Sequence, residues 1–369
     1  MKLLIIARPF VFHGGVERAT VGLIGALVDH GYDVHLLSPP GQAPMRGVTL
    51  HTLSLPPLPS AARVLALALS ARRAVAQASW DIVQSHERTL RQDVYRAGEG
   101  CHRAYLASEA HPRARGLYHR IVLGLERRVF ARTPRIVAIA EAGRREIQTL
   151  YGVASERIAV VYNGVDLRRF HPDNRVRYRA PVRAAAGIPA DAYTLLFVGS
   201  GFARKGLATA VEAFAAFGDR ASRLLVLGKG DVREYQALAA RLGVAERVVW
   251  LGARADPERW YAGADVVVLP SRYEPFGNVH LEALASGVPV IASARAGGAE
   301  VITEGVTGAV VKPTDAGAIA AALERFRERP ENDLMQAARR AVEPYTYAAQ
   351  VNGFAQVYAQ VARARVDIS

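Results

Sequence analysis

The sequence predicts an α/β protein of two Rossmann-like, doubly wound domains that face each other across a cleft. Short apolar segments alternate along the chain with segments of helical period, a pattern typical of parallel strands joined by helices. Two apolar segments, residues 2–7 and 193–199, run into glycine-containing loops that precede a helical segment. With 369 residues, the chain is long enough for two domains of ordinary size.

The predicted elements follow the same order in both halves. In the first half, the strand at 2–7 leads into a helix from about residue 16 to residue 30, and strands follow at 34–37, 81–84, 135–139 and 159–162. In the second half, strands are predicted at 193–199, 223–227, 248–251, 265–269, 288–291 and 308–311. Turn residues and charges gather between residues 163 and 179, so we expect domains at 1–168 and 169–345. Ligands of such domains bind at the carboxyl ends of the strands.

The composition favours a cytoplasmic protein. No segment has the roughly 18 consecutive apolar residues of a membrane-spanning helix, and the N-terminal strand does not resemble a signal peptide. The single cysteine, Cys101, excludes an intramolecular disulfide framework. The formal net charge is +13, with 47 basic residues against 34 acidic ones, and only four of the basic residues are lysines. Lys205 and Lys229 are distinctive because they lie on glycine-rich loops.

A Pro-Phe-Gly turn carries the most informative motif of the sequence. Glu274 and Glu282 stand eight residues apart around this turn, between the strand at 265–269 and a helix predicted at 278–286. Glu274 then lies in the loop at the carboxyl end of the strand, and Glu282 lies about one turn inside the helix. A loop with two solvated glutamates is the alternative. Amides at the start of the helix suit an anionic oxygen, and they belong to Gly277, Asn278 and Val279.

Glycine-containing loops that follow four of the strands are candidate ligand contacts. The loop at 199–206 places Gly201 before Arg204 and Lys205, and these two cations can bind a diphosphate whose charge grows as it leaves. A solvated Arg-Lys pair is the alternative. Weaker signals, each of which is also compatible with a plain turn, are the loops that carry Gly14 and Gly15, Gly228 and Lys229, and Arg254.

The sequence Glu-Pro-Phe-Gly followed by Glu-Ala at this spacing resembles the signature of the retaining glycosyltransferases of family 4, which have a GT-B fold. The resemblance covers essentially the whole chain. It implies that Glu282 holds ribose hydroxyls, that Glu274 lies beside the transferred sugar, and that retention follows front-face attack. It also implies that the last helix, residues 346–369, packs back onto the first domain.

The same resemblance assigns the remaining donor-binding positions. Arg204 and Lys205 correspond to the diphosphate-binding pair of the family. The other positions expected to contact the donor are Gly14, Gly15, Gly201, Gly228, Lys229, Arg254, Phe276, Gly277, Asn278 and Val279. No Asp-x-Asp motif and no Cys/His cluster with metal spacing is present, so we expect no metal and no cofactor beside the UDP-sugar substrate.

Two residues are candidates for a functional group in the first domain. His86 follows the strand at 81–84, where many relatives carry a functional histidine or acid. Glu99 follows a segment, Asp93-Val94-Tyr95, that resembles the lipopolysaccharide-core glucosyltransferases of the family. The loops at 14–18 and 198–206 resemble the same branch. We leave the choice between Glu99 and His86 open, and a structural histidine is a further alternative for His86.

A basic segment with interleaved aromatic residues runs from residue 102 to residue 135 and contains eight arginines and two glutamates. Helical spacing between residues 116 and 130 predicts a basic amphipathic helix that can lie on an anionic membrane. An ordinary helix with arginine-rich edges is the alternative, and no nucleic-acid-binding motif is present. The arginines expected to contact membrane or acceptor are Arg103, Arg113, Arg115, Arg120, Arg127 and Arg128.

These observations predict an enzyme that transfers a hexose, with glucose favoured, from a UDP-sugar to the lipopolysaccharide core. It would be a peripheral protein on the cytoplasmic face of the inner membrane, with a lipid-linked glycan as acceptor. The alternatives are a family 4 transferase for a capsule or exopolysaccharide lipid intermediate, and a non-catalytic membrane-associated scaffold that keeps a nucleotide pocket. The sequence leaves the sugar, the base, the linkage and the oligomeric state open.

Overall fold

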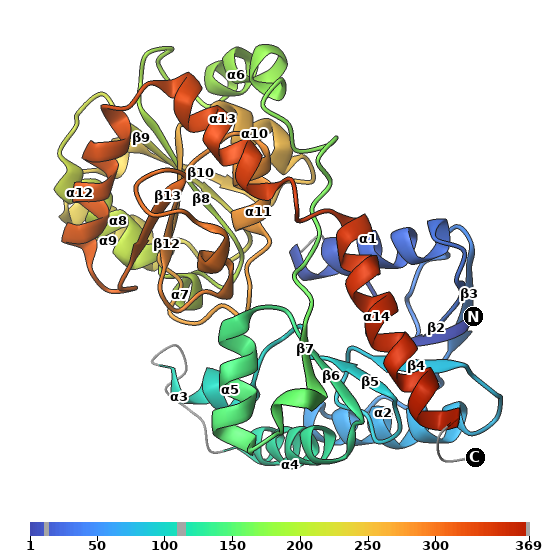
Figure 1. The fold of residues 1–369 in the computed structure, drawn as a ribbon. Coiled ribbons are helices and arrows are strands. Elements are labelled where there is room, and N and C mark those ends of the chain that lie inside the picture. The colour runs from blue at the N-terminus through green and yellow to red at the C-terminus, as the bar shows by residue number, and fades with distance from the viewer. Residues whose placement is uncertain (11–14, 109–115, 367–369) are drawn as a thin grey trace. The chain divides into compact units, whose positions relative to one another are not determined.

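The chain forms two compact units in the computed structural model, which describes residues 1–10, 15–108 and 116–366 (Figure 1). The first unit comprises Met1–Gly164 and the chain from Tyr347 onward, and the second comprises Val165–Thr346. The chain passes between the units after residues 164 and 346, where the sequence suggested boundaries after residues 168 and 345.

The first unit contains a parallel sheet of seven strands in the order β3-β2-β1-β4-β5-β6-β7. Its strands are β1 (Lys2–Ile6), β2 (Asp33–Ser38), β3 (Val48–Thr52), β4 (Ile82–Ser85), β5 (Val94–Arg96), β6 (Arg135–Ala138) and β7 (Ile158–Val160). The sequence prediction missed β3 and β5. β3 is an edge strand whose side chains are half-exposed or exposed, and β5 has three residues, one of them a buried arginine, so neither has an apolar run.

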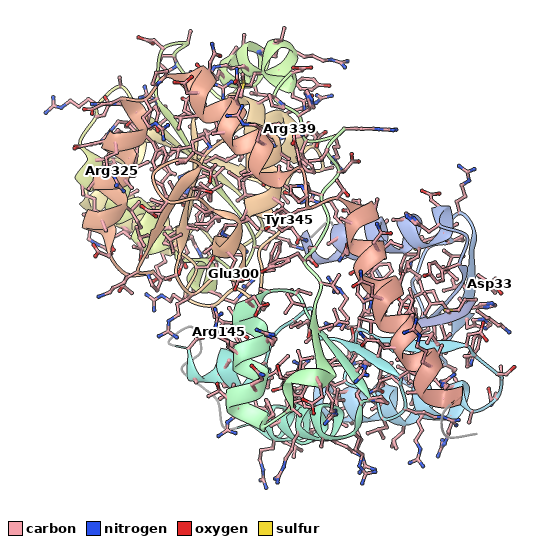
Figure 2. All side chains as sticks on the ribbon, viewed as in Figure 1. Asp33, Arg145, Glu300, Arg325, Arg339 and Tyr345 are labelled. Atoms are coloured by element: carbon pink, nitrogen blue, oxygen red, sulfur yellow. The ribbon has the colours of Figure 1, made fainter. Side chains whose placement is uncertain are left out.

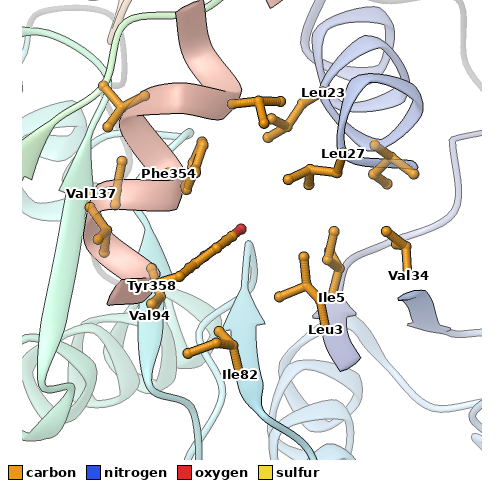
Figure 3. Packing of buried hydrophobic residues seen from close by; sticks show 14 of the residues in the cluster. Leu3, Ile5, Leu23, Leu27, Val34, Ile82, Val94, Val137, Phe354 and Tyr358 are labelled. Atoms are coloured by element: carbon orange, nitrogen blue, oxygen red, sulfur yellow. The ribbon is translucent and has the colours of Figure 1, made fainter. Parts of the chain in front are cut away.

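Helices of the first unit include the last helix of the chain. They are α1 (Gly15–Asp29), α2 (Ser60–Val75), α3 (His102–Ala107), α4 (Leu117–Arg132), α5 (Glu141–Tyr151), the 3₁₀ helix η1 (Ser155–Arg157) and α14 (Tyr347–Val366). Phe354 and Tyr358 of α14 share a buried cluster with Leu23 and Leu27 of α1 and with Ile5 of β1 (Figure 3). The first unit therefore depends on a helix that the chain reaches only after the whole second unit.

The second unit contains a parallel sheet of six strands in the order β10-β9-β8-β11-β12-β13. Its strands are β8 (Thr194–Val198), β9 (Arg223–Leu227), β10 (Val248–Gly252), β11 (Val266–Leu269), β12 (Val290–Ser293) and β13 (Gly308–Val311). The helices are α6 (Asn174–Ala185), α7 (Phe202–Lys205), α8 (Leu207–Phe217), α9 (Arg233–Arg241), α10 (Pro257–Gly263), α11 (Val279–Ala285), α12 (Ala316–Arg327), α13 (Glu331–Val342) and the 3₁₀ helices η2 (Ala245–Arg247) and η3 (Gly297–Val301).

Three arginines join helices of the second unit to neighbouring segments. Arg179 and Arg183 of α6 pair with Asp265, which also accepts a hydrogen bond from the Thr194 amide at 2.7 Å. Asp265 was predicted to begin a strand, but it lies just before β11 and anchors α6 instead. Arg339, which Figure 2 labels on α13, donates to the carbonyl oxygens of Phe170 and Ala285 at 2.9 and 3.0 Å.

Both sheets are doubly wound, which confirms the predicted fold class. The direction in which strands are added reverses between β1 and β4 in the first unit and between β8 and β11 in the second. Parallel α/β sheets bind ligands at this switch point, beyond the carboxyl ends of the strands. The loops after β8 and β11, residues 199–206 and 270–278, therefore meet where a ligand of the second unit is expected.

Candidate active site

Three predicted site residues of the second unit come together at its switch point. Glu274, in the loop after β11, accepts a hydrogen bond from Arg204 Nη1 at 2.9 Å through Oε2, and the same oxygen pairs with the Lys205 ammonium. Arg204 and Lys205 end the short helix α7, which follows β8. The structure thus joins two loops, about 70 residues apart in the sequence, into one charged cluster.

Main-chain hydrogen bonds hold the Glu274 loop on both sides. The Glu274 amide donates to the Arg295 carbonyl at 3.2 Å, and the Gly297 amide donates to the Glu274 carbonyl at 2.9 Å. On the other side, the Arg272 amide donates to the Arg204 carbonyl at 2.8 Å. The backbone from which the Glu274 side chain reaches the two cations is therefore held on both flanks.

The charge of Glu274 is stabilised despite its burial. Burial favours the neutral acid, but the charges of Lys205 and Arg204 outweigh this effect and lower the pKa of Glu274 to about 2. A carboxyl group with a depressed pKa stabilises the fold at neutral pH, and that contribution is lost as the pH falls below the ordinary carboxyl range towards 2.

His280 is a buried neighbour of this loop that sequence analysis did not select. Its Nδ1 lies 2.6 Å from the Gly277 carbonyl, which can only accept, so Nδ1 carries the proton. Burial lowers the pKa of His280 to about 4, and among the described residues Nε2 has no hydrogen-bond partner. Gly277 has φ +86°, and a Cβ there would press on the His280 ring and the Glu274 side chain. The glycine turn therefore lets histidine and glutamate pack together.

Glu282 lies within α11, as predicted, and is buried with a hydrogen-bond donor from another element. Its Oε2 accepts from the Tyr261 hydroxyl of α10 at 2.9 Å. The helix begins at Val279 and places Asn278 at the N-cap, and Phe276 is buried immediately before it. These positions are close to the sequence prediction, but their assignment to a donor remains a prediction.

The remaining loops of the second unit approach one another closely. A Cβ at Gly228 would overlap the Gly199 carbonyl, and the Lys229 amide donates to Ser200 Oγ at 3.1 Å. Gly201 has φ +75°, the left-handed conformation that glycine adopts without strain. Arg254 lies with its guanidinium 5.3 Å from the Trp260 ring centre. The glycines therefore permit backbone contact between loops, and Arg254 is engaged with an aromatic ring.

In the first unit, a chain of ion pairs lies in the loops that follow β1, β4 and β5. Glu99 accepts from Arg88 Nη1 at 3.1 Å and also pairs with Arg8, which in turn pairs with Glu87. Arg88 also donates to the fully buried Glu126, with 2.8 Å between Arg88 Nη2 and Glu126 Oε2. Sequence analysis found Glu99 but missed its partners, because residues this far apart leave no local pattern.

His86, the other candidate of the first unit, belongs to a separate hydrogen-bonded chain. The Tyr358 hydroxyl donates to Gln84 Oε1 at 2.6 Å, and the Gln84 amide lies 2.7 Å from His86 Nε2. Burial, together with the nearby charge of Arg96, lowers the pKa of His86 well below its ordinary value, so the ring is neutral at neutral pH. Since the side-chain nitrogen of Gln84 can only donate, His86 Nε2 accepts and Nδ1 carries the proton.

The basic segment contains the predicted helix, α4. Arg120, Arg127 and Arg128 are exposed on it, whereas Arg103 of α3 donates to the Leu150 carbonyl at 3.0 Å. Gly14, Arg113 and Arg115 lie outside the described residues, and Gly15 begins α1. Within the described part of the chain, no helix has the length and hydropathy to cross a bilayer. The same residues include no group of three or more His, Cys, Asp or Glu side chains that could hold a metal ion.

Comparison with known families identifies both halves of the chain. The model described as Glycosyltransferase Family 4 matches residues 13–169, and the model described as Glycosyl transferases group 1 matches residues 179–343. The chain belongs to the glycosyltransferases of family 4. This glycosyltransferase resembles solved structures along almost its whole length, and these structures support the GT-B fold.

Two solved structures share the fold of this chain, and two curated relatives match part of its sequence. WaaG, a glycosyltransferase involved in lipopolysaccharide biosynthesis, has a TM-score of 0.79 and 23% identity, with 98% of each chain covered. Anabaena Alr3699/HepE in complex with UDP and glucose has a TM-score of 0.74 and 20% identity, covering 98% of this chain and 100% of that one.

A D-inositol 3-phosphate glycosyltransferase of Thermomonospora curvata is 36% identical over 225 residues, 57% of this chain and 52% of that protein. An uncharacterized glycosyltransferase of Methanocaldococcus jannaschii is 33% identical over 52% of this chain and 50% of its own length. The chain thus matches about half the length of these curated relatives.

Proposed function

We propose that this family 4 glycosyltransferase is a retaining, metal-independent enzyme that transfers a hexose, with glucose favoured, from a UDP-sugar to the lipopolysaccharide core. The cluster of Arg204, Lys205 and Glu274 at the switch point of the second unit carries the proposal. In the transfer, the bond between the anomeric carbon and the diphosphate breaks, the oxygen of an acceptor hydroxyl bonds to the same face of the sugar, and the hydroxyl proton passes to the departing diphosphate. The two cations stabilise the charge that gathers on the leaving diphosphate.

The known neighbours support a nucleotide-sugar donor. Alr3699/HepE has been solved with UDP and glucose, and WaaG takes part in lipopolysaccharide biosynthesis, although at these identities the likeness reaches only to the fold. We therefore assign the donor to the second unit, and we assign the acceptor to the first, near Glu99 or His86. On this assignment, Glu282 is the ribose-binding carboxylate, while Tyr261 orients it.

A phosphorylated inositol is a second candidate acceptor. Several D-inositol 3-phosphate glycosyltransferases are among the curated relatives, at 34–36% identity over about half of this chain. Such an acceptor is water-soluble and needs no membrane. Assays with a soluble inositol phosphate and with a lipid-linked core glycan separate the two candidates, because only one of them should accept labelled sugar.

Calorimetric titration with UDP, GDP and ADP tests the donor, first with a metal chelator present and then with Mg²⁺. We expect UDP to bind with about micromolar affinity in both conditions. Glu282→Gln keeps an acceptor for Tyr261 but loses the charge that binds ribose hydroxyls, so it should weaken UDP binding by about tenfold. The exposed Glu212→Gln is the matched control. Unchanged UDP affinity in Glu282→Gln would remove this residue from the donor site.

Vesicle sedimentation tests the proposed peripheral membrane location. Replacing Arg120, Arg127 and Arg128 with Gln should release the protein from anionic vesicles at physiological salt, since each basic residue near such a surface contributes about 1 kcal/mol. A variant with three exposed arginines of the second unit replaced, Arg220, Arg233 and Arg241, has the same net charge and should stay bound. Equal release of both variants would show that total charge, rather than α4, determines binding.

A further inference from the structure

The cations that we assign to the diphosphate are already paired with an internal anion. One carboxylate oxygen of Glu274 accepts a hydrogen bond from Arg204 Nη1 at 2.9 Å and also contacts the Lys205 ammonium. The side chains of Glu274 and Lys205 are each 9% exposed, whereas that of Arg204 is 31% exposed. A nucleotide that reaches this pair therefore approaches a site in which one negative charge is built in.

The backbone around Glu274 is held beside the two cations. Its amide and carbonyl are both bonded to the loop at 295–297, and the neighbouring Arg272 amide is bonded to the Arg204 carbonyl. Arg204 Nη1 also donates to the Tyr273 carbonyl at 3.1 Å. A bound diphosphate must then share the cations with a fixed carboxylate, and its own charge determines how strongly the carboxylate repels it.

The donor and the product of glycosyl transfer differ in that charge. In a nucleoside diphosphate sugar, the terminal phosphate is esterified and keeps one ionisable oxygen, which is charged at neutral pH. In the free nucleoside diphosphate, the same phosphate is a monoester whose second proton leaves near pH 6, so at neutral pH it carries almost one additional charge. A fixed carboxylate close to this phosphate repels the product more strongly than the donor.

We propose that Glu274 is a specificity-determining residue whose charge lowers the affinity of the site for the free nucleoside diphosphate relative to the sugar-bearing one. This inference rests on the proposed function and adds a second task to Glu274, beside the sugar contact that the family resemblance implies. The carboxylate weakens binding of the leaving nucleotide once the sugar is gone, because it then competes for Arg204 and Lys205. The enzyme would thus limit inhibition by its own product.

Titration of wild type and Glu274→Gln with UDP and with uridine tests the inference. UDP has no sugar on its diphosphate, so a lost sugar contact cannot affect the result. Glu274→Gln should bind UDP about tenfold more tightly at about pH 8, where the additional charge is complete, and the gain should shrink at about pH 5.5. Uridine affinity should not change, and Glu274→Asp, which keeps the charge, should show less than half of the gain.

Equal or weaker UDP binding by Glu274→Gln would overturn the inference, as would an equal gain in Glu274→Asp. If Glu274→Gln fails to fold, wild type still decides the matter: its affinity for UDP, relative to that for UDP-glucose, should rise by less than about threefold as the pH rises from about 5.5 to about 8, because the carboxylate offsets part of the attraction of the two cations. A larger rise would overturn the proposal. Failure of wild type to bind UDP, GDP or ADP at all would instead refute the proposed function.

Discussion

Replacing both Arg204 and Lys205 with Ala should lower the rate of sugar transfer by about 100-fold or more. Groups that are fixed in place to stabilise charge developing in the transition state contribute about this much even singly. The structure adds a second reason, since the double variant leaves the buried Glu274 without its two counterions. Its pKa, now about 2, should rise, because burial then acts without opposition.

Single-turnover transfer from a labelled donor is the measurement for this double variant. The matched control is the triple variant that also carries Glu274→Gln, because it removes the unpaired buried charge. We expect the triple variant to regain thermal stability but not activity. A double variant that transfers sugar at close to the wild-type rate would contradict the assignment of the two cations to the leaving group.

Replacing Glu126 with Ala should lower the free energy of unfolding of the first unit by about 3–5 kcal/mol, the usual cost of breaking a buried ion pair. Glu126 is fully buried and accepts from Arg88 Nε and Nη2 at 3.0 and 2.8 Å, from the Tyr151 hydroxyl, and from the His102 amide at 2.7 Å at the start of α3. Without it, Arg88 keeps a buried charge whose main counterion is gone.

Urea denaturation followed by Trp80 fluorescence measures this effect. Trp80 is the single tryptophan of the first unit, so replacing Trp250 and Trp260 with Phe in the background lets one ring report on that unit. Glu99→Gln is the matched control: it removes a half-exposed carboxylate from the same arginine and should cost about 1 kcal/mol or less. A loss below about 1 kcal/mol in Glu126→Ala would mean that water or another acceptor replaces the carboxylate.

The sequence predicted those parts of the candidate site that local patterns encode. Glu274 could be placed because an apolar strand, a Pro-Phe-Gly turn and a helix follow one another directly, and Glu282 could be placed by its distance along that helix. Arg204 and Lys205 could be placed in the same way after β8. Their direct pairing with Glu274 was not predicted, because it depends on how two loops end beside each other at the switch point.

Other features depend on long-range packing and had no sequence signal. Arg88 pairs with Glu126, which lies 38 residues further along the sequence, and neither residue belongs to a recognisable motif. His280 lies on a buried helix among apolar residues, so the sequence pattern alone does not distinguish it from a core residue. Its contact with the Gly277 carbonyl through Nδ1 is visible only in the structure. The strands β3 and β5 were missed for a related reason, since one lies at an edge and the other is too short to show alternation.

The course of the chain through α14 has a consequence for biosynthesis. Val165 and Thr346 pair as neighbours at the two ends of the second unit, which is therefore complete once residue 346 has been made. The first unit still lacks Phe354 and Tyr358 of its buried cluster at that moment. Domains usually fold in the order in which the ribosome releases them, amino-terminal first. Here that order cannot hold for the first unit, because its sheet stays without α14 until the whole second unit has been made.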